Sequence, residues 1–336
     1  MDLNIIWFFL VGILIIGYAI LDGFDLGVGS VYLFAKFQER DIARNSIAPV
    51  WDGNEVWLVT GGGALFAAFP MVYATVFSGF YLALILLLFA LIFRAVSLEL
   101  RNHFQKESTK TLFDWIFSIS SILAIVLFGV AVGNVLSGLD LNKSGDYIGT
   151  FFDLLNPYSI LVGVLAFFML SYQGTVWLFL KTEGEFQQKV KNWAKVYWSG
   201  YFILFLLCTI LAYMLHKNLF NNYLANPLMF LIPLLGLVFM VASLIRIQRN
   251  NPLCAFIASS LSIATIILSA YLSLFPNLII AKNNPAYSLT IYNASSTQLT
   301  LETMLIIAII GMPLVLIYTI YSYKIFHGKT KSEEGY

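Results

Sequence analysis

Long apolar stretches recur along this entire chain of 336 residues, and they limit its fold more than any other feature. An α-helix needs roughly 20 apolar residues to cross about 30 Å of hydrocarbon. The stretches that meet this requirement are Ile5–Phe34, Val56–Val76, Gly79–Leu98, Trp115–Leu136, Pro157–Leu180, Val196–Leu215, Leu228–Ile245, Leu253–Leu274 and Met304–Ile325. We therefore predict an all-α polytopic membrane protein with nine transmembrane helices. They are expected to form a single integral membrane domain over residues 1–336.

The composition argues against a soluble domain. Charged residues make up 11% of the chain and hydrophobic residues 60%, whereas a soluble domain carries about 25% charged residues to hydrate its surface. The net charge of +1 gives no indication of nucleic-acid binding. Cys208 and Cys254 lie in or beside apolar stretches without CxxC spacing or a Cys/His cluster, which indicates buried thiols rather than a zinc site or a disulfide.

The basic residues predict the orientation of the chain. If the N-terminus lies outside, Lys143, Lys217 and Lys282 are the only three of the 19 Lys and Arg residues on the outer side. Cytoplasmic segments of membrane proteins are rich in Lys and Arg, so this distribution predicts an outer N-terminus and a cytoplasmic C-terminus. The first apolar stretch lacks a basic leading region and a small-residue cleavage site, which favours a retained transmembrane helix over a signal peptide.

The longest outer connection covers residues 275–303 and is polar and rich in turn-forming residues. Two alternatives remain open for it from the sequence: a folded cap over the outer face, or a solvated loop.

Two acidic residues, Asp22 and Asp25, lie within the first apolar stretch and are followed by Gly27 and Gly29. Their i, i+3 spacing places both carboxylates on one face of a helix. Ionisable groups inside a membrane are costly and mark function, and two close carboxylates do not both ionise easily, which suits proton exchange. The alternative is a pair of polar anchors at a helix–helix contact, with the glycines permitting close approach.

A second polar group opens the next apolar stretch, where Asp52, Asn54 and Glu55 lie between Trp51 and Trp57. Acidic residues in the first turn of a helix are favoured by the helix dipole, so helix capping is one explanation. So many polar groups beside two tryptophans exceed what capping requires, which favours a functional site.

A third group comprises Arg94, Glu99 and Arg101 at the end of the third apolar stretch. Arg94 lies deepest and requires an anionic partner, for which the candidates are Asp22, Asp25 and Asp52. Arg101 is better explained by a side chain that extends to the membrane interface. Asp114, just before the fourth stretch, is predicted to cap a helix.

Together these groups predict a polar file that leads from the cytoplasm into the membrane. Such a file suits proton uptake better than acid–base catalysis on a soluble substrate. The candidate proton-path residues are Asp22, Asp25, Asp52, Glu55, Arg94 and Glu99.

Haem ligands are not evident in the sequence. His103, His216 and His327 all fall at helix ends or in loops, and none lies in mid-membrane opposite a second His or Met. We therefore predict no catalytic, cofactor-binding or metal-ligating residue on this chain.

Several blocks of sequence resemble subunit II of the cytochrome bd-type quinol oxidases. They occur in family order over essentially the whole chain and are most specific in the first hundred residues. The blocks are Leu21–Gly29, Asn45–Trp57, Gly61–Pro70, Phe77–Tyr81, Phe93–Arg94, Ser288–Thr290, Asn293–Ser295 and Leu299–Leu301.

This resemblance implies a terminal respiratory oxidase in the bacterial cytoplasmic (inner) membrane, which oxidises a membrane quinol, reduces O₂ to water and generates proton-motive force without pumping. It implies a heterodimer in which subunit I ligates two haems b and one haem d, and leaves open a small single-helix subunit. It also implies a cytoplasmic proton channel that includes the Asp of the Trp-Asp-Gly-Asn motif, here Asp52.

The chain departs from some family members near this channel. Val50 stands where some carry a His, and Glu99 where some carry an Asp, which keeps the carboxylate. His103 stands near the position of a Lys, so the channel mouth differs.

Two other classes of function are compatible with intramembrane acids. A purely structural scaffold subunit would use them to hold helices together. A proton-coupled secondary transporter would use them for transport, but would be expected to show internal repeats and broken helices.

Overall fold

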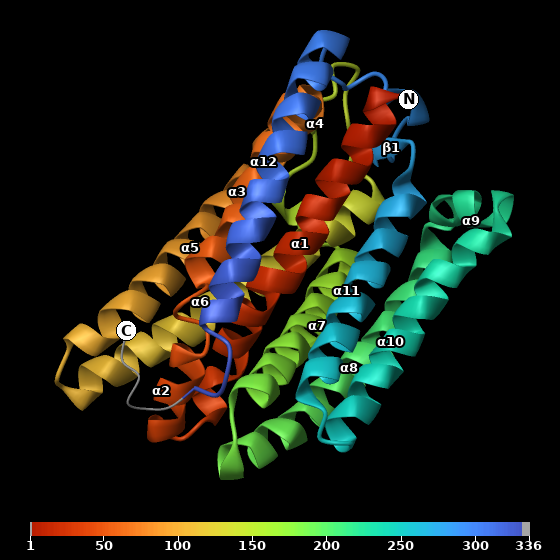
Figure 1. The fold of residues 1–336 in the computed structure, drawn as a ribbon. Coiled ribbons are helices and arrows are strands. Elements are labelled where there is room, and N and C mark those ends of the chain that lie inside the picture. Colours follow the sequence, from red (N-terminus) through yellow and green to blue (C-terminus); the bar gives the residue numbers. More distant parts are fainter. Residues whose placement is uncertain (1, 331–336) are drawn as a thin grey trace.

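The computed structural model describes residues 2–330, and Figure 1 shows these as a bundle of long helices. The long helices are α1 (Leu3–Val31), α3 (Trp51–Ala68), α5 (Tyr81–Leu100), α6 (Glu107–Ser137), α7 (Pro157–Lys181), α8 (Gly184–Leu215), α10 (Leu231–Gln248), α11 (Pro252–Leu274) and α12 (Gln298–Ile325). Shorter elements connect them: α2 (Phe37–Asn45), α4 (Pro70–Gly79), α9 (Asn221–Ala225), and the 3₁₀ turns η1 (Tyr32–Phe34), η2 (Arg101–His103), η3 (Phe151–Leu155), η4 (Lys217–Phe220), η5 (Pro227–Phe230) and η6 (Pro285–Tyr287).

Eight helices among the described residues are long and apolar enough to cross a membrane, which confirms a polytopic all-α protein. They correspond to every predicted stretch except Val56–Val76. That stretch is not one helix: α3 ends at Ala68 and α4 begins at Pro70, with Phe69 in a non-helical conformation between them. Pro70 has no amide hydrogen and disfavours a helical residue before it, so the prediction of one continuous helix is wrong here.

Glycine contacts bring α1 and α7 close together. A Cβ on Gly27 would overlap the backbone of Leu170 and Gly174. One turn further along, the hydroxyls of Ser30 and Ser171 form a hydrogen bond of 2.7 Å. Close helix approach at Gly27, which belonged to the alternative explanation of this region, is therefore present, and both explanations of the two acids stay open.

The connection between α11 and α12 forms a folded cap, not a solvated loop. Strand β1 (Asn277–Ile279) pairs antiparallel with β2 (Leu289–Thr290). Leu139, in the segment after α6, donates its amide hydrogen to Ile280 O at 2.9 Å and thereby joins the cap to the bundle. The cap lies at the same end of the molecule as the N-terminus, as Figure 1 shows for β1.

A buried ion-pair network fixes the opposite end, where α2 lies. Arg101 Nε lies 2.5 Å from Asp114 Oδ1 and Arg101 Nη1 2.5 Å from Asp41 Oδ1. Asp114 also accepts hydrogen bonds from Tyr32 at 3.0 Å and from Arg40 at 3.1 Å. The predictions for two of these residues were therefore wrong: Arg101 does not extend to the interface, and Asp114 lies in the second turn of α6 and does not cap it. Their partners come from α2 and η1, far away in sequence.

Helix α12 has little contact with the rest of the chain. It packs against α1 and α3, but no residue of its most apolar 18-residue window is buried. In Figure 1 this helix, in blue, runs along the outside of the bundle. Its apolar side chains must therefore contact lipid or another protein.

Candidate functional site

Asp22 and Arg94 form a buried ion pair between α1 and α5. Arg94 Nη1 lies 2.7 Å from Asp22 Oδ1, and the two side chains are 2% and 0% exposed. Of the three acids predicted as partners of Arg94, Asp22 is thus the one in contact. Although the two groups are close, the angles between them are not those of a hydrogen bond. Among the described residues, neither side chain has a hydrogen-bond partner for its buried polar atoms. Buried polar groups of this kind are normally satisfied by ordered water.

Glu55 connects this pair to a more accessible position. Its carboxylate lies 3.6 Å from Arg94 Nη2 and is 24% exposed, which makes it the half-buried member of the group. The Arg94 guanidinium also lies over the Trp51 ring, 5.9 Å from its centroid. Positive charge on Arg94 is therefore shared among two carboxylates and an aromatic face.

Asp25 has a different partner, although it is one turn from Asp22 on the same helix. Asn54 of α3 donates from Nδ2 to Asp25 Oδ2 at 2.7 Å, and Tyr323 of α12 donates to Asn54 Oδ1 at 2.8 Å. Asp25 is 1% exposed and its second oxygen, Oδ1, has no hydrogen-bond partner among the described residues. One carboxylate thus faces a cation and the other a chain of neutral donors.

Asp52 and Glu99 lie on the surface of the chain and do not join the buried cluster. Both are exposed, on α3 and α5. The Glu99 carboxylate accepts a hydrogen bond of 3.1 Å from Trp51 Nε1. The N-cap of α3 is Val50, and Asp52 follows it in the first turn, where its carboxylate accepts the Gly53 amide hydrogen at 2.7 Å. Stabilisation by the helix dipole therefore remains an explanation for Asp52.

The sequence therefore predicted four residues that the structure brings together: Asp22, Asp25, Glu55 and Arg94. It missed Tyr323, because nothing in the last helix distinguishes this tyrosine from its exposed neighbours Tyr318 and Tyr321. Asn54 was part of the recognised motif but was not chosen as a site residue. Its role depends on α1 and α12, which contact it from opposite ends of the chain.

The segment after α12 folds back onto the end of α7. Lys181 Nζ donates to Phe326 O at 2.5 Å, and Thr330 N donates to Lys181 O at 2.9 Å. Lys329 Nζ donates to Leu180 O and Thr182 O at 2.9 and 2.8 Å. These bonds satisfy backbone carbonyls that end a helix.

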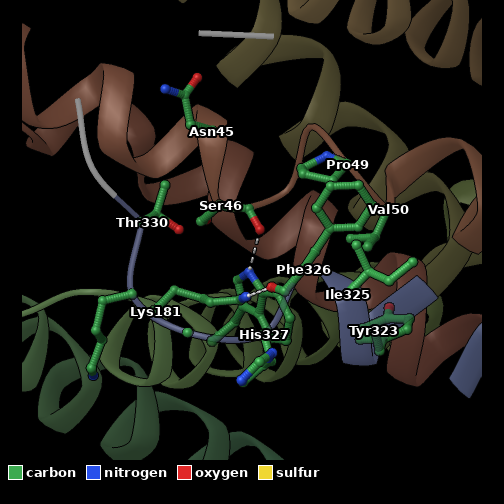
Figure 2. A pocket seen from close by; sticks show the side chains of 13 residues that line it. Asn45, Ser46, Pro49, Val50, Lys181, Tyr323, Ile325, Phe326, His327 and Thr330 are labelled. Atoms are coloured by element: carbon green, nitrogen blue, oxygen red, sulfur yellow. Dashed lines mark hydrogen bonds between the residues drawn. The ribbon is translucent and has the colours of Figure 1, made fainter. Parts of the chain in front are cut away.

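This segment closes a pocket of about 320 Å³ at the end of the molecule that carries α2. Figure 2 shows Tyr323 beside Ile325 at one side of the pocket and Thr330 at the other. Trp177 Nε1 donates across the pocket wall to Ser46 O at 3.2 Å. Water that enters the pocket can therefore approach the Tyr323 side chain.

A second cavity of about 340 Å³ lies among α1, α6, α7, α8, α10 and α11 and has an almost entirely apolar lining. A haem would need a His, Met, Cys or Tyr ligand in a suitable position. None of the three histidines lines this cavity, and they lie in η2, after α8 and after α12. His216 packs against the Tyr158 ring and His327 Nδ1 bonds to Lys324 O. The cavity lining does include Tyr158, Met169 and Cys208.

Comparison with known proteins gives one consistent result. The sequence model of cytochrome bd terminal oxidase subunit II matches residues 3–326. Cytochrome bd-I ubiquinol oxidase subunit 2 of Escherichia coli (strain K12) is 37% identical over 365 aligned positions, which cover 99% of this chain and 96% of the relative. Cytochrome bd ubiquinol oxidase subunit 2 of Bacillus subtilis (strain 168) is 32% identical over an alignment that covers 99% of this chain and 98% of the relative. The solved bd oxidase from Geobacillus thermodenitrificans has the same fold, with a TM-score of 0.80 at 19% identity over 97% of this chain and 99% of that one.

Proposed function

Because the chain belongs to the cytochrome bd terminal oxidase subunit II family, we propose that its buried acids carry cytoplasmic protons towards a haem site on the partner subunit. The chain is subunit II of a cytochrome bd quinol oxidase, an oxidoreductase complex, and a multi-pass protein of the bacterial inner membrane. The complex carries haem, and its other main subunit is subunit I.

The observation that carries the proton-path proposal is the buried cluster of Asp22, Asp25, Glu55 and Arg94. Charged groups inside a membrane are retained where they move protons or ions. Glu55 is half-buried and stands between the exposed acids and the fully buried ones. We place the entrance at Asp52 and Glu99 and the inner end at Asp22 and Asp25.

The chemistry of the path follows from the partners of each acid. Asp22 forms a buried ion pair with the Arg94 guanidinium at 2.7 Å, which suits a fixed counter-charge. Among residues 2–330, Asp25 contacts no cation directly and its Oδ1 accepts no hydrogen bond, which suits a group that takes up and releases a proton. The haems b and d of the complex are proposed to be ligated by subunit I, where they supply the electron transfer and O₂ chemistry.

We propose nine membrane crossings, with the N-terminus outside and the C-terminus in the cytoplasm. Helix α3 would supply the ninth crossing, since it runs from the α2 end of the bundle to the α4 end (Figure 1). The segregation of Lys143, Lys217 and Lys282 from the other basic residues supports this orientation. The same arrangement makes residues 1–336 a single membrane domain.

Subunit I is proposed to bind the face formed by α3, α5 and α12. Asp52 and Glu99 open on this face, beside exposed apolar side chains such as Val59 and Phe93. A carboxylate in contact with lipid is costly, so this face is better covered by protein. Protons that enter here would also be close to the partner.

The Asp25→Asn variant, purified as the whole heterodimer, tests the path. We expect quinol-dependent O₂ consumption to fall by about tenfold or more, while the reduced-minus-oxidised haem spectrum stays normal. Glu107→Gln, which changes an exposed acid at the start of α6, is the matched control. Normal turnover in Asp25→Asn would rule out the path through Asp25, and loss of haem together with turnover would indicate a scaffold role instead.

A further inference from the structure

The hydrogen bonds around Asn54 can have only one direction while Asp25 is ionised. Asn54 Nδ2 contacts Asp25 Oδ2 at 2.7 Å and Leu21 O at 3.4 Å, and both atoms can only accept. The amide must therefore turn its NH₂ group towards α1 and its oxygen towards α12. Tyr323 must then donate its hydroxyl hydrogen to Asn54 Oδ1.

A proton on Asp25 removes the requirement that the carboxylate sets, although the amide gives up its 3.4 Å contact with Leu21 O if it turns over. A protonated Asp25 can donate its hydrogen to Asn54 Oδ1 once the amide turns over, and Asn54 Nδ2 then donates to the Tyr323 oxygen. The Tyr323 hydroxyl hydrogen is released from Asn54 in this arrangement. Only one proton has been added, at Asp25, and no covalent bond other than its O–H bond has formed.

The two arrangements differ in how Tyr323 is used. Tyr323 lines the pocket that the segment after α12 closes (Figure 2), and its hydroxyl bonds to Asn54. The Tyr323 ring is held in both arrangements, since it packs edge-on against two other rings. Its centroid lies 6.5 Å from that of Phe24 and 6.2 Å from that of Trp177. Donation by Tyr323 to Asn54 therefore favours the orientation that serves the ionised carboxylate.

We propose that Tyr323 is a positioning residue that acts through Asn54 to set the pH at which Asp25 takes up a proton. The proposal rests on the proposed proton path and adds a residue from α12 to it. Tyr323 does not carry the proton itself, because an amide lies between it and the carboxylate.

Other charged groups surround Asp25 and must stay constant in a test. They are Asp22 on the same helix, Glu55 from α3 and Arg94 from α5. None of them contacts Tyr323 by a hydrogen bond or ion pair among the described residues. A Tyr323→Phe change therefore removes the donor to Asn54 and leaves these charges in place.

The test is an infrared pH titration of the intact oxidase complex. The carbonyl stretch of protonated Asp25 is identified as the band that is lost in Asp25→Asn. In Tyr323→Phe we expect the pH at which this band reaches half intensity to rise by about 0.5 to 1 unit, because donation by Tyr323 polarises the Asn54 amide and strengthens its bond to the ionised carboxylate. Tyr321→Phe, which alters a 60% exposed tyrosine on the same helix, should leave the titration unchanged.

Asn54→Leu, of similar size, provides the second variant. It should raise the half-point further than Tyr323→Phe, and adding Tyr323→Phe to it should cause no additional shift, since Tyr323 acts through Asn54. An unshifted titration in Tyr323→Phe, or an equal shift in the Asn54→Leu background, would overturn the proposal.

The outcome is separable from that of the proton-path proposal. The infrared band reports the proton on Asp25 whether or not that proton is used in turnover. If Asp25→Asn keeps full turnover but Tyr323→Phe shifts the band, the path is wrong and the positioning role stands. If Asp25→Asn loses turnover and the band is unshifted in Tyr323→Phe, the path stands and the positioning role is wrong.

Discussion

At the scale of single residues, the spacing of Asp22 and Asp25 was informative but incomplete. The i, i+3 spacing correctly placed both on one helix face. It could not show that Asp22 pairs with Arg94 while Asp25 bonds to Asn54, because those partners come from two other helices. The assignment of unlike roles to the two acids comes from these contacts.

Replacement of Arg94 alone should lower the stability of the complex far more than replacement of both Asp22 and Arg94. Arg94→Met leaves Asp22 buried without its cation, which costs about 3–5 kcal/mol. We expect a marked fall in the thermal stability of the complex, which can be measured from its haem absorbance during heating. The double variant Asp22→Asn/Arg94→Met should regain most of the lost stability. A double variant as unstable as the single one would show that Asp22 and Arg94 do not stabilise each other.

Asp52 should affect rate rather than assembly. It is exposed on the isolated chain and bonds only to the adjacent Gly53 amide, at 2.7 Å, among the described residues. Asp52→Asn is therefore expected to lower O₂ consumption while haem content stays normal. Unchanged turnover would remove Asp52 from the proposed entrance and leave Glu99 as the candidate.

At the scale of helices, apolar length and glycine spacing predicted most of the architecture. The eight candidate spans fall on predicted stretches because a long apolar run has few alternatives in a membrane. The break at Phe69–Pro70 was missed because the apolar pattern continues through it. The network around Asp114 was missed because it joins segments that are distant in sequence.

The close contact of α1 and α7 predicts a strong effect of one methyl group. Gly27→Ala would push these helices apart, because its Cβ meets backbone atoms that cannot move independently. We expect a lower yield of haem-loaded complex and a lower melting temperature. Gly311→Ala is the control, since a Cβ there meets nothing within 4 Å from any other described element. Equal stability of the two variants would contradict this account of the contact.

The contact of α2 with α8 should weaken in acid. Partial burial raises the pKa of Glu39, but hydrogen bonds from Lys189 and the Lys36 amide outweigh this and hold it below its ordinary value. The stabilisation from ionised Glu39 is therefore complete above its pKa in the unfolded chain, about 4.3. It is lost as the pH falls through the lower pKa of Glu39 in the folded protein. We expect the difference in melting temperature between the parent protein and Glu39→Gln to be constant from about pH 7 to pH 5 and to shrink below about pH 4. A difference that stays constant in acid would show that the charge of Glu39 is not involved.

At the scale of the whole molecule, the exposed acidic and apolar side chains indicate where a partner can bind. The sequence predicted a membrane protein but could not tell lipid-facing from partner-facing residues, because both are apolar. In the structure, exposed acids and exposed apolar side chains occur together on the α3 and α5 surface. This combination is what distinguishes the proposed interface.

Two matched valines test that interface. Val59 on α3 is 73% exposed and Val196 on α8 is 65% exposed. Val59→Trp should reduce co-purification of subunit I, because a large ring disrupts a packed protein interface, whereas Val196→Trp is expected to be tolerated by lipid. The reverse pattern would move the interface to α8.

The bond between Tyr323 and Asn54 also has a consequence in time. The two residues are 269 positions apart, and at typical bacterial rates of synthesis this distance takes roughly 15 to 50 s to translate. Helices α1 and α3 are thus synthesised well before α12. Asp25 reaches its final hydrogen-bond arrangement only when α12 has docked, so a nascent chain completes the Asp25–Asn54–Tyr323 contacts late in its own biosynthesis.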